Sequence, residues 1–187
     1  MERFEICLAG HGGQGLVLAG KILAEALALY HGKQVVQTQS YGPEARGGAS
    51  RSEIVVSSSP IDYPKVTKPD LLLTLNQESL NRYLPNLKEE GILVADAENT
   101  KEIPPGKFKS YSLPITQLAK AELGKTIFSN IIALGAIAAI TGIIPREPLE
   151  KAVISNVPAA SREMNKKALD LGFRAGEEAA KSAGRSH

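Results

Sequence analysis

Two glycine-rich segments are the parts of this sequence best suited to chemistry. The first, residues 10–15, reads Gly-His-Gly-Gly-Gln-Gly and fits the pattern G-x-G-x-x-G. An apolar run precedes it and an amphipathic stretch follows it, so it is predicted to join a strand to a helix. In that position glycines let the backbone approach a phosphate, while free amides and the positive end of the helix attract the anion. The alternative is a tight turn that binds nothing.

The second segment, residues 40–50, follows the next predicted strand and contains Arg46, Gly47 and Gly48. Loops that follow parallel strands gather at the carboxyl edge of a sheet, so these residues are expected to face the first loop. A guanidinium beside backbone donors suits the recognition of phosphate or carboxylate. A surface loop with its arginine in water is the alternative that the chemistry leaves open.

Asn76 and Gln77 follow another predicted strand and are expected at the same edge, either as ligand contacts or as helix caps. His11, inside the first loop, has no carboxylate or nucleophile near it in the sequence, and acid–base catalysis needs such partners. We therefore expect no catalytic residue in this chain.

A nicotinamide dinucleotide fits the first loop poorly. Dinucleotide sites carry an acidic residue about 20 residues further on, where it binds the ribose hydroxyls. The second predicted strand of this chain offers Gln34, Gln37 and Gln39 there, with neither Asp nor Glu. The pattern therefore indicates a phosphate-bearing ligand other than NAD.

The composition limits the cofactors that this chain could hold by itself. Its 187 residues include one cysteine, Cys7, and three histidines, and the formal net charge is +2. One cysteine supports neither a disulfide framework nor a four-cysteine iron–sulfur site, and three scattered histidines argue against zinc. The charge balance gives no general attraction to nucleic acid or to membrane surfaces. Redox or metal chemistry would need another chain.

The N-terminus lacks the pattern of a signal peptide, so a cytoplasmic protein is expected. Residues 126–144 carry no charge, and a stretch of that length could span a bilayer. The polar residues Ser129, Asn130 and Thr141, and the lack of Trp or Tyr at its ends, favour a helix buried inside the domain.

Strand and helix patterns alternate along most of the chain. Apolar runs predict strands at residues 6–9, 33–37, 53–56, 71–75, 92–95 and 109–112. Helical patterns cover residues 16–30, 76–83, 115–123, 127–140, 147–155 and 162–180. This order predicts an α/β fold: one Rossmann-like, three-layer domain over residues 1–187, with a mainly parallel sheet and a helix-rich C-terminal third.

The two glycine-rich segments also carry a resemblance to a known family. The chain resembles the gamma subunit of 2-oxoacid:ferredoxin oxidoreductases over nearly its whole length, most clearly in residues 10–23, 39–50, 69–78 and 91–94. The second loop is its most specific part. Its form is most similar to the 2-oxoglutarate type, because pyruvate-type gamma chains tend to carry a second arginine in place of Ala45.

The resemblance implies an enzyme divided among subunits. The family decarboxylates a 2-oxoacid on thiamine diphosphate, passes electrons through iron–sulfur clusters to ferredoxin, and transfers the acyl group to coenzyme A. The resemblance implies that alpha and beta subunits, and in some complexes a ferredoxin-like delta subunit, hold the thiamine and the clusters. The gamma chain is expected to serve coenzyme A binding and assembly, with no partner among nucleic acids or membranes.

The resemblance also assigns residues to coenzyme A. The expected contacts are Gly12, Gly13, Gln14, Gly15, Arg46, Gly47 and Gly48, together with Asn76 and Gln77. Three alternatives stay open. The loops could mainly dock partner subunits, the chain could be a pyruvate- or branched-chain-type gamma subunit, or it could be a stand-alone nucleotide-binding or regulatory module.

Overall fold

A six-stranded sheet forms the centre of the molecule. The computed structural model describes residues 2–41 and 49–183. The strands lie in the order β2-β3-β1-β4-β5-β6 and span Phe4–His11 (β1), Gln34–Tyr41 (β2), Ala49–Ser57 (β3), Leu71–Thr74 (β4), Ile92–Asp96 (β5) and Lys109–Leu113 (β6). Strands β1, β4, β5 and β6 are paired in parallel, whereas β3 runs antiparallel to both β1 and β2. The predicted mainly parallel sheet is confirmed.

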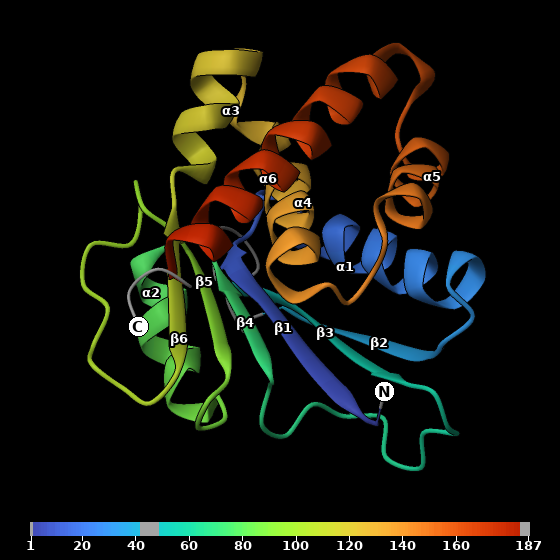
Figure 1. The fold of residues 1–187 in the computed structure, drawn as a ribbon, viewed down its shortest axis with the longest axis vertical. Coiled ribbons are helices and arrows are strands. Elements are labelled where there is room, and N and C mark those ends of the chain that lie inside the picture. The colour runs from blue at the N-terminus through green and yellow to red at the C-terminus, as the bar shows by residue number, and fades with distance from the viewer. Residues whose placement is uncertain (1, 42–48, 184–187) are drawn as a thin grey trace.

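Helices cover both faces of the sheet unequally (Figure 1). One face carries α1, α3, α4, α5 and α6, and the other carries α2. Their bounds are Leu16–Glu25 (α1), Gln77–Tyr83 (α2), Ile115–Leu123 (α3), Ser129–Thr141 (α4), Arg146–Asn156 (α5) and Arg162–Ala183 (α6). The three-layer arrangement and the helix-rich C-terminal third follow the prediction.

The pleat of β1 explains how one strand serves two cores. Ile6 and Leu8 pack under the large helical layer, whereas Cys7 and Ala9 face α2. Successive side chains of a strand point to opposite faces, so a strand covered on both sides must be apolar at every position. The continuous apolar run that predicted this strand reflects that double burial.

Helix α4 is the uncharged segment of the sequence, and it is buried inside the domain. Every residue from Ser129 to Ala138 is buried. The expectation of a buried helix is therefore confirmed. Across the described ranges 2–41 and 49–183, no helix is long and apolar enough to cross a membrane.

Strands β2 and β3 are longer than the sequence predicted. The strands are extended by residues 38–41 and 49–52, so that residues 40, 41, 49 and 50 of the expected loop belong to strands. The two strands pair from Gln34–Ser57 to Tyr41–Ser50, so backbone hydrogen bonds between neighbouring strands hold these polar residues extended. A second difference is that the helix predicted over 16–30 widens into a π-helical turn at Ala26–Tyr30.

Glycines allow α4 and α6 to lie in backbone contact. A Cβ atom at Gly172 would collide with the carbonyl oxygen of Ile132, and one at Gly176 would lie 2.7 Å from the carbonyl oxygen of Ala136. On α4 itself, a Cβ at Gly135 would lie 2.5 Å from the carbonyl oxygen of Leu169. Because all three neighbours are backbone atoms, they cannot move aside as a flexible side chain would.

Replacing Gly172 with alanine should therefore destabilise the fold. Helix propensity alone predicts that a Gly-to-Ala change within a helix stabilises by about 1 kcal/mol. The collision with α4 should reverse that sign and lower the free energy of unfolding by about 1–3 kcal/mol. Chemical denaturation of the Gly172→Ala variant and of the wild type measures this difference in the free energy of unfolding. A stabilised variant would contradict the close packing of α4 and α6.

Candidate functional site

The glycine loop lies where β1 leaves the core and α1 begins. Gly12 and Gly13 are exposed, and Gly13 adopts a φ of 90° with nothing within 4 Å of the position a Cβ would occupy. Gly15 has a φ of 73° and precedes the first residue of α1. No side chain caps that helix end, so its first-turn amides lack a side-chain partner. This geometry suits an anionic group held by backbone donors.

Gln14 shapes the loop from within. Its Oε1 accepts a hydrogen bond from the backbone N–H of His11 at 2.6 Å, and its Nε2 lies 3.5 Å from the carbonyl oxygen of Leu75. Its Oε1 also fills the space that a Cβ at Gly10 would need. Both polar ends of the Gln14 side chain are therefore turned toward protein, and what Gln14 offers a ligand is its backbone.

Arg46, Gly47 and Gly48 lie outside the described residues. The strands that flank them do reach the expected edge, since Tyr41 at the end of β2 pairs with Ser50, and Ala49 at the start of β3 pairs with His11. The carboxyl ends of β1 and β2 therefore meet at one edge of the sheet, as the sequence predicted. The role of Arg46, Gly47 and Gly48 as ligand contacts stays a prediction.

Asn76 and Gln77 reach the same edge after β4, and both have structural partners. Asn76 caps α2, because its Oδ1 accepts from the N–H of Ser79 at 2.8 Å. Gln77 Oε1 accepts from the N–H groups of Lys101 and Glu102 at 2.8 and 3.0 Å. Its Nε2 donates to the carbonyl oxygen of Glu102 at 2.8 Å. Gln77 therefore fastens the loop after β5, and the helix-cap alternative is confirmed for Asn76.

A polar cavity of about 380 Å³ adjoins the glycine loop on the side of α3 and α4. Sequence reasoning identified Gly13 and Gln14 but missed the rest of its lining, which comprises Asn99, Thr116, Lys120, Thr126, Ile127 and Ser129. Lys120 forms an ion pair with Glu98, and Thr116 donates from its hydroxyl to the buried Asp96 at 2.6 Å. No local signal could have revealed these residues, because they come from segments about a hundred positions downstream of the loop.

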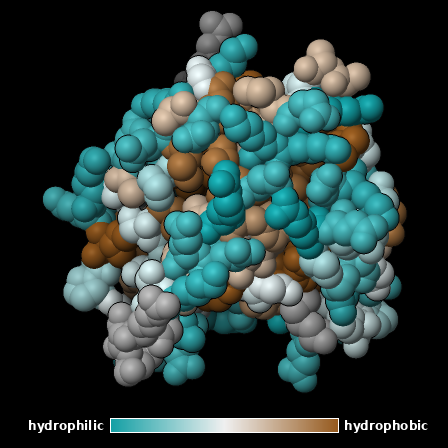
Figure 2. Space-filling model, turned by 45° about the horizontal axis from the view of Figure 1, so that its top comes forward, coloured by the Kyte–Doolittle hydropathy of each residue, from teal (hydrophilic) through white to brown (hydrophobic). Residues whose placement is uncertain are grey.

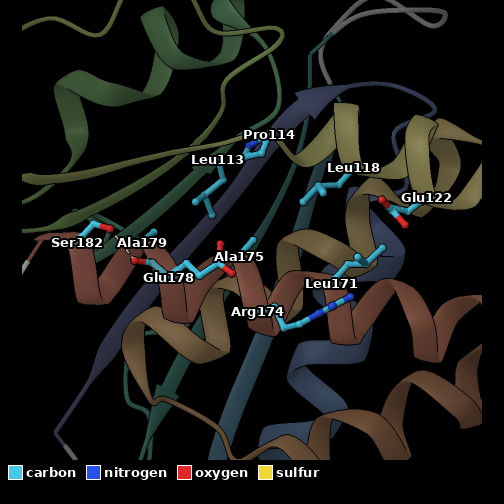
Figure 3. Close-up of a pocket in the computed structure, with 10 residues that line it drawn as sticks. All are labelled: Leu113, Pro114, Leu118, Glu122, Leu171, Arg174, Ala175, Glu178, Ala179 and Ser182. Carbon is cyan, nitrogen blue, oxygen red and sulfur yellow. Dashed lines mark hydrogen bonds between the residues drawn. The ribbon is translucent and has the colours of Figure 1, made fainter.

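A second hollow is lined by residues of β6, α3 and α6 (Figure 3). It has a volume of about 440 Å³ and lies between β6, α3 and α6. Leu113, Leu118 and Leu171 line it, and Arg174 and Glu178 belong to its lining as well. On the face formed by the outer helices, polar side chains predominate and apolar ones show only in small separate areas (Figure 2). None of the described residues predicted to bind a ligand lines this hollow.

His11 has a neighbour that the sequence did not reveal. Its Nδ1 lies 3.9 Å from a carboxylate oxygen of Glu78, and both side chains are exposed. An exposed contact of this length, which is an ion pair only when the imidazole is protonated, contributes little energy. Cys7 is not an accessible nucleophile for this pair, because it is buried in β1 with 3% of its surface exposed.

Comparisons with known proteins agree on one family. The chain matches the Pyruvate ferredoxin/flavodoxin oxidoreductase family over residues 5–175. It is 46% identical to 2-oxoglutarate synthase subunit KorC of Methanocaldococcus jannaschii, over 94% of this chain and 95% of that protein. The solved structure of the keto/oxoacid ferredoxin oxidoreductase gamma subunit from Geobacter sulfurreducens matches with a TM-score of 0.89 and 47% identity, over 96% and 99% of the two chains.

A larger enzyme shares the fold. The solved structure of 2-oxoglutarate:ferredoxin oxidoreductase from Magnetococcus marinus, with 2-oxoglutarate, coenzyme A and succinyl-CoA bound, matches with a TM-score of 0.85. The match covers 95% of this chain and 32% of that one at 23% identity, so it shows the fold alone.

Cys7 should be chemically inert in the folded protein. Burial, with a smaller contribution from the Glu53 carboxylate, raises the pKa of the Cys7 thiol to about 12. Only the thiolate reacts with disulfide reagents, so the native protein should react very slowly from pH 7 up to pH of about 10. Titration with a chromogenic disulfide should release one thiol per chain only after unfolding in guanidinium. Rapid reaction of the native protein would contradict this burial.

Proposed function

The chain belongs to the Pyruvate ferredoxin/flavodoxin oxidoreductase family, as a gamma-type chain, and we propose that it is the gamma subunit of a 2-oxoglutarate:ferredoxin oxidoreductase. The observation that supports 2-oxoglutarate as the substrate of the complex is the 46% identity to a 2-oxoglutarate synthase subunit over nearly the full length of both proteins. In that complex the chain would contribute to coenzyme A binding and to assembly during oxidative decarboxylation in the cytoplasm.

The glycine loop supports the coenzyme A part of the proposal. Coenzyme A carries phosphate groups, and exposed glycine amides at an uncapped helix start suit such groups. Gly12, Gly13 and Gly15 would hold a phosphate through the backbone, and Arg46, Gly47 and Gly48 would close on it from the neighbouring loop. Gln14, Asn76 and Gln77 would act mainly by holding the surrounding backbone, because their side chains bond to protein.

The remaining chemistry would reside on other subunits. An iron–sulfur cluster needs several cysteine ligands, whereas Cys7 is alone and buried. We therefore assign the clusters and the thiamine diphosphate to alpha and beta partners, with a ferredoxin-like delta subunit where the complex has one, and ferredoxin as the electron acceptor. The thiol of coenzyme A would meet the acyl group there, so this chain holds and orients the carrier without reacting itself.

The subunit role predicts a dependence that a stand-alone nucleotide-binding module would not show. With 2-oxoglutarate and coenzyme A, the isolated chain should reduce no viologen dye, whereas the complete complex should. The matched control is the same complex prepared without this chain. Full coenzyme A-dependent activity in that control would contradict the proposed function. Activity of the complete complex with pyruvate or branched-chain 2-oxoacids instead of 2-oxoglutarate would change the assigned substrate to that 2-oxoacid.

Arg46 should matter for coenzyme A more than for the 2-oxoacid. Removing a hydrogen bond to a charged group costs about 1.5–3 kcal/mol, which corresponds to a rise in KM for coenzyme A of about ten- to one-hundred-fold in the Arg46→Ala complex. The KM for 2-oxoglutarate should stay within about two-fold. Arg162→Ala, at the exposed first residue of α6, is the matched loss of a guanidinium elsewhere. An unchanged KM for coenzyme A would indicate that Arg46 docks partner subunits and does not bind coenzyme A.

A further inference from the structure

Asn130 links the glycine loop to helix α4. It is the second residue of α4, and 4% of its surface is exposed. Its Nδ2 donates a hydrogen bond to the carbonyl oxygen of Gly15 at 3.1 Å, across 115 positions of sequence. The same carbonyl accepts from the N–H of Ala19 at 2.9 Å, within the first turn of α1. The last residue of the loop is thereby held from α1 and from α4 at once.

The Asn130 side chain has a fixed orientation. While Nδ2 reaches Gly15, Oδ1 accepts from the backbone N–H of Ile131 at 2.8 Å, so both ends of the amide are engaged. Rotating the amide by half a turn would break both bonds. Helix α4 is itself held firmly, because Gly172 and Gly176 bring the backbone of α6 against it. Asn130 therefore transmits the position of the α4–α6 pair to the loop.

A hydrogen bond from Asn130 affects the conformation of the loop most strongly at Gly15. Its φ of 73° lies in the left-handed region, which is where the chain turns from β1 into α1. A Cβ at this position would lie 2.5 Å from Nδ2 of Asn130, so the absence of a side chain is what lets the amide approach. The direction of the exposed Gly12 and Gly13 amides depends on this turn, since they precede Gly15 by three and two residues.

We infer that Asn130 is a positioning residue that presets the glycine loop to hold the phosphate of an incoming ligand. The inference rests on the proposed function, in which that ligand is coenzyme A. Asn130 does not touch the ligand. It acts by keeping Gly15 in its left-handed conformation before the ligand arrives, which lowers the entropy cost of ordering the loop on binding.

The substitution Asn130→Asp tests the inference in the assembled complex. Aspartate has the same shape and keeps the Oδ1 that accepts from Ile131, but in its ionised form it cannot donate to Gly15, and its carboxylate faces the Gly15 carbonyl, so the assay is run at about pH 8 to favour ionisation. The KM for coenzyme A should rise about three- to ten-fold, while kcat and the KM for 2-oxoglutarate should change by less than about two-fold. Asn130→Gln, which carries the same donor on a longer side chain, should recover part of the affinity.

Asn165→Asp is the matched control. Asn165 is buried to a similar degree, with 6% of its surface exposed, and its Nδ2 donates to the carbonyl oxygen of Ser161 at 2.9 Å. This variant loses the same kind of bond in α6 away from the loop, so it should leave the KM for coenzyme A unchanged. A general loss of stability would affect both variants and both substrates, whereas a positioning role affects coenzyme A alone.

The outcomes separate this inference from the proposed function. If Arg46→Ala raises the KM for coenzyme A and Asn130→Asp does not, the positioning role is wrong and the function stands. If the complex needs this chain but neither variant changes the KM for coenzyme A, the loops dock partners and both the coenzyme A assignment and the positioning role fail. Equal effects of Asn130→Asp and Asn165→Asp would also overturn the positioning role.

Discussion

The double burial of β1 is the constraint on which the rest of the structure depends. The strand pairs on both edges, with β3 and β4, and packs on both faces, so its interior must be apolar from Ile6 to Ala9. Polar groups can be placed only near the two ends of the strand, at Glu5 on the amino side and from Gly10 onward on the carboxyl side, where the glycine loop begins. The chain must then turn into α1 at once, because α1 covers the same sheet. Left-handed backbone at Gly13 and Gly15 makes that turn.

The local features of the fold could be predicted from the sequence, because each one rests on neighbouring residues. The continuous apolar run of β4 indicates burial on both faces, and the glycines after β1 indicate a strand-to-helix turn. The direction of β3 could not be predicted in the same way. Alternation from Arg51 to Ile54 tells which side chains share a face but says nothing of whether a strand runs parallel or antiparallel to its neighbour. Its reversal still leaves the carboxyl ends of β1 and β2 at one edge, because both strands run antiparallel to β3.

The candidate site could be predicted in its position but not in its internal bonding. Sequence places the amide side chains of Gln14 and Gln77 near the carboxyl edge of the sheet. It cannot show that Gln14 bonds to His11, or that Gln77 bonds to the loop at Lys101 and Glu102. Asn130 carries no local signal, because its partner Gly15 lies 115 positions away and asparagine near a helix start is commonly a cap. What sequence misses is the set of contacts made only when distant segments meet.

A loop that binds through its backbone can be selective only for the kind of group it holds. Amide donors recognise an anionic oxygen, and they carry no information about which acyl group a carrier will receive. On the proposed function, the choice among 2-oxoacids must therefore be made where the 2-oxoacid itself is held, on another subunit. This would explain how a chain whose one cysteine is buried can belong to a redox enzyme. On the proposed function the demands on this chain are geometric, and the buried strand, the glycine loop, the neighbouring loop with Arg46 and one distant asparagine would meet them together.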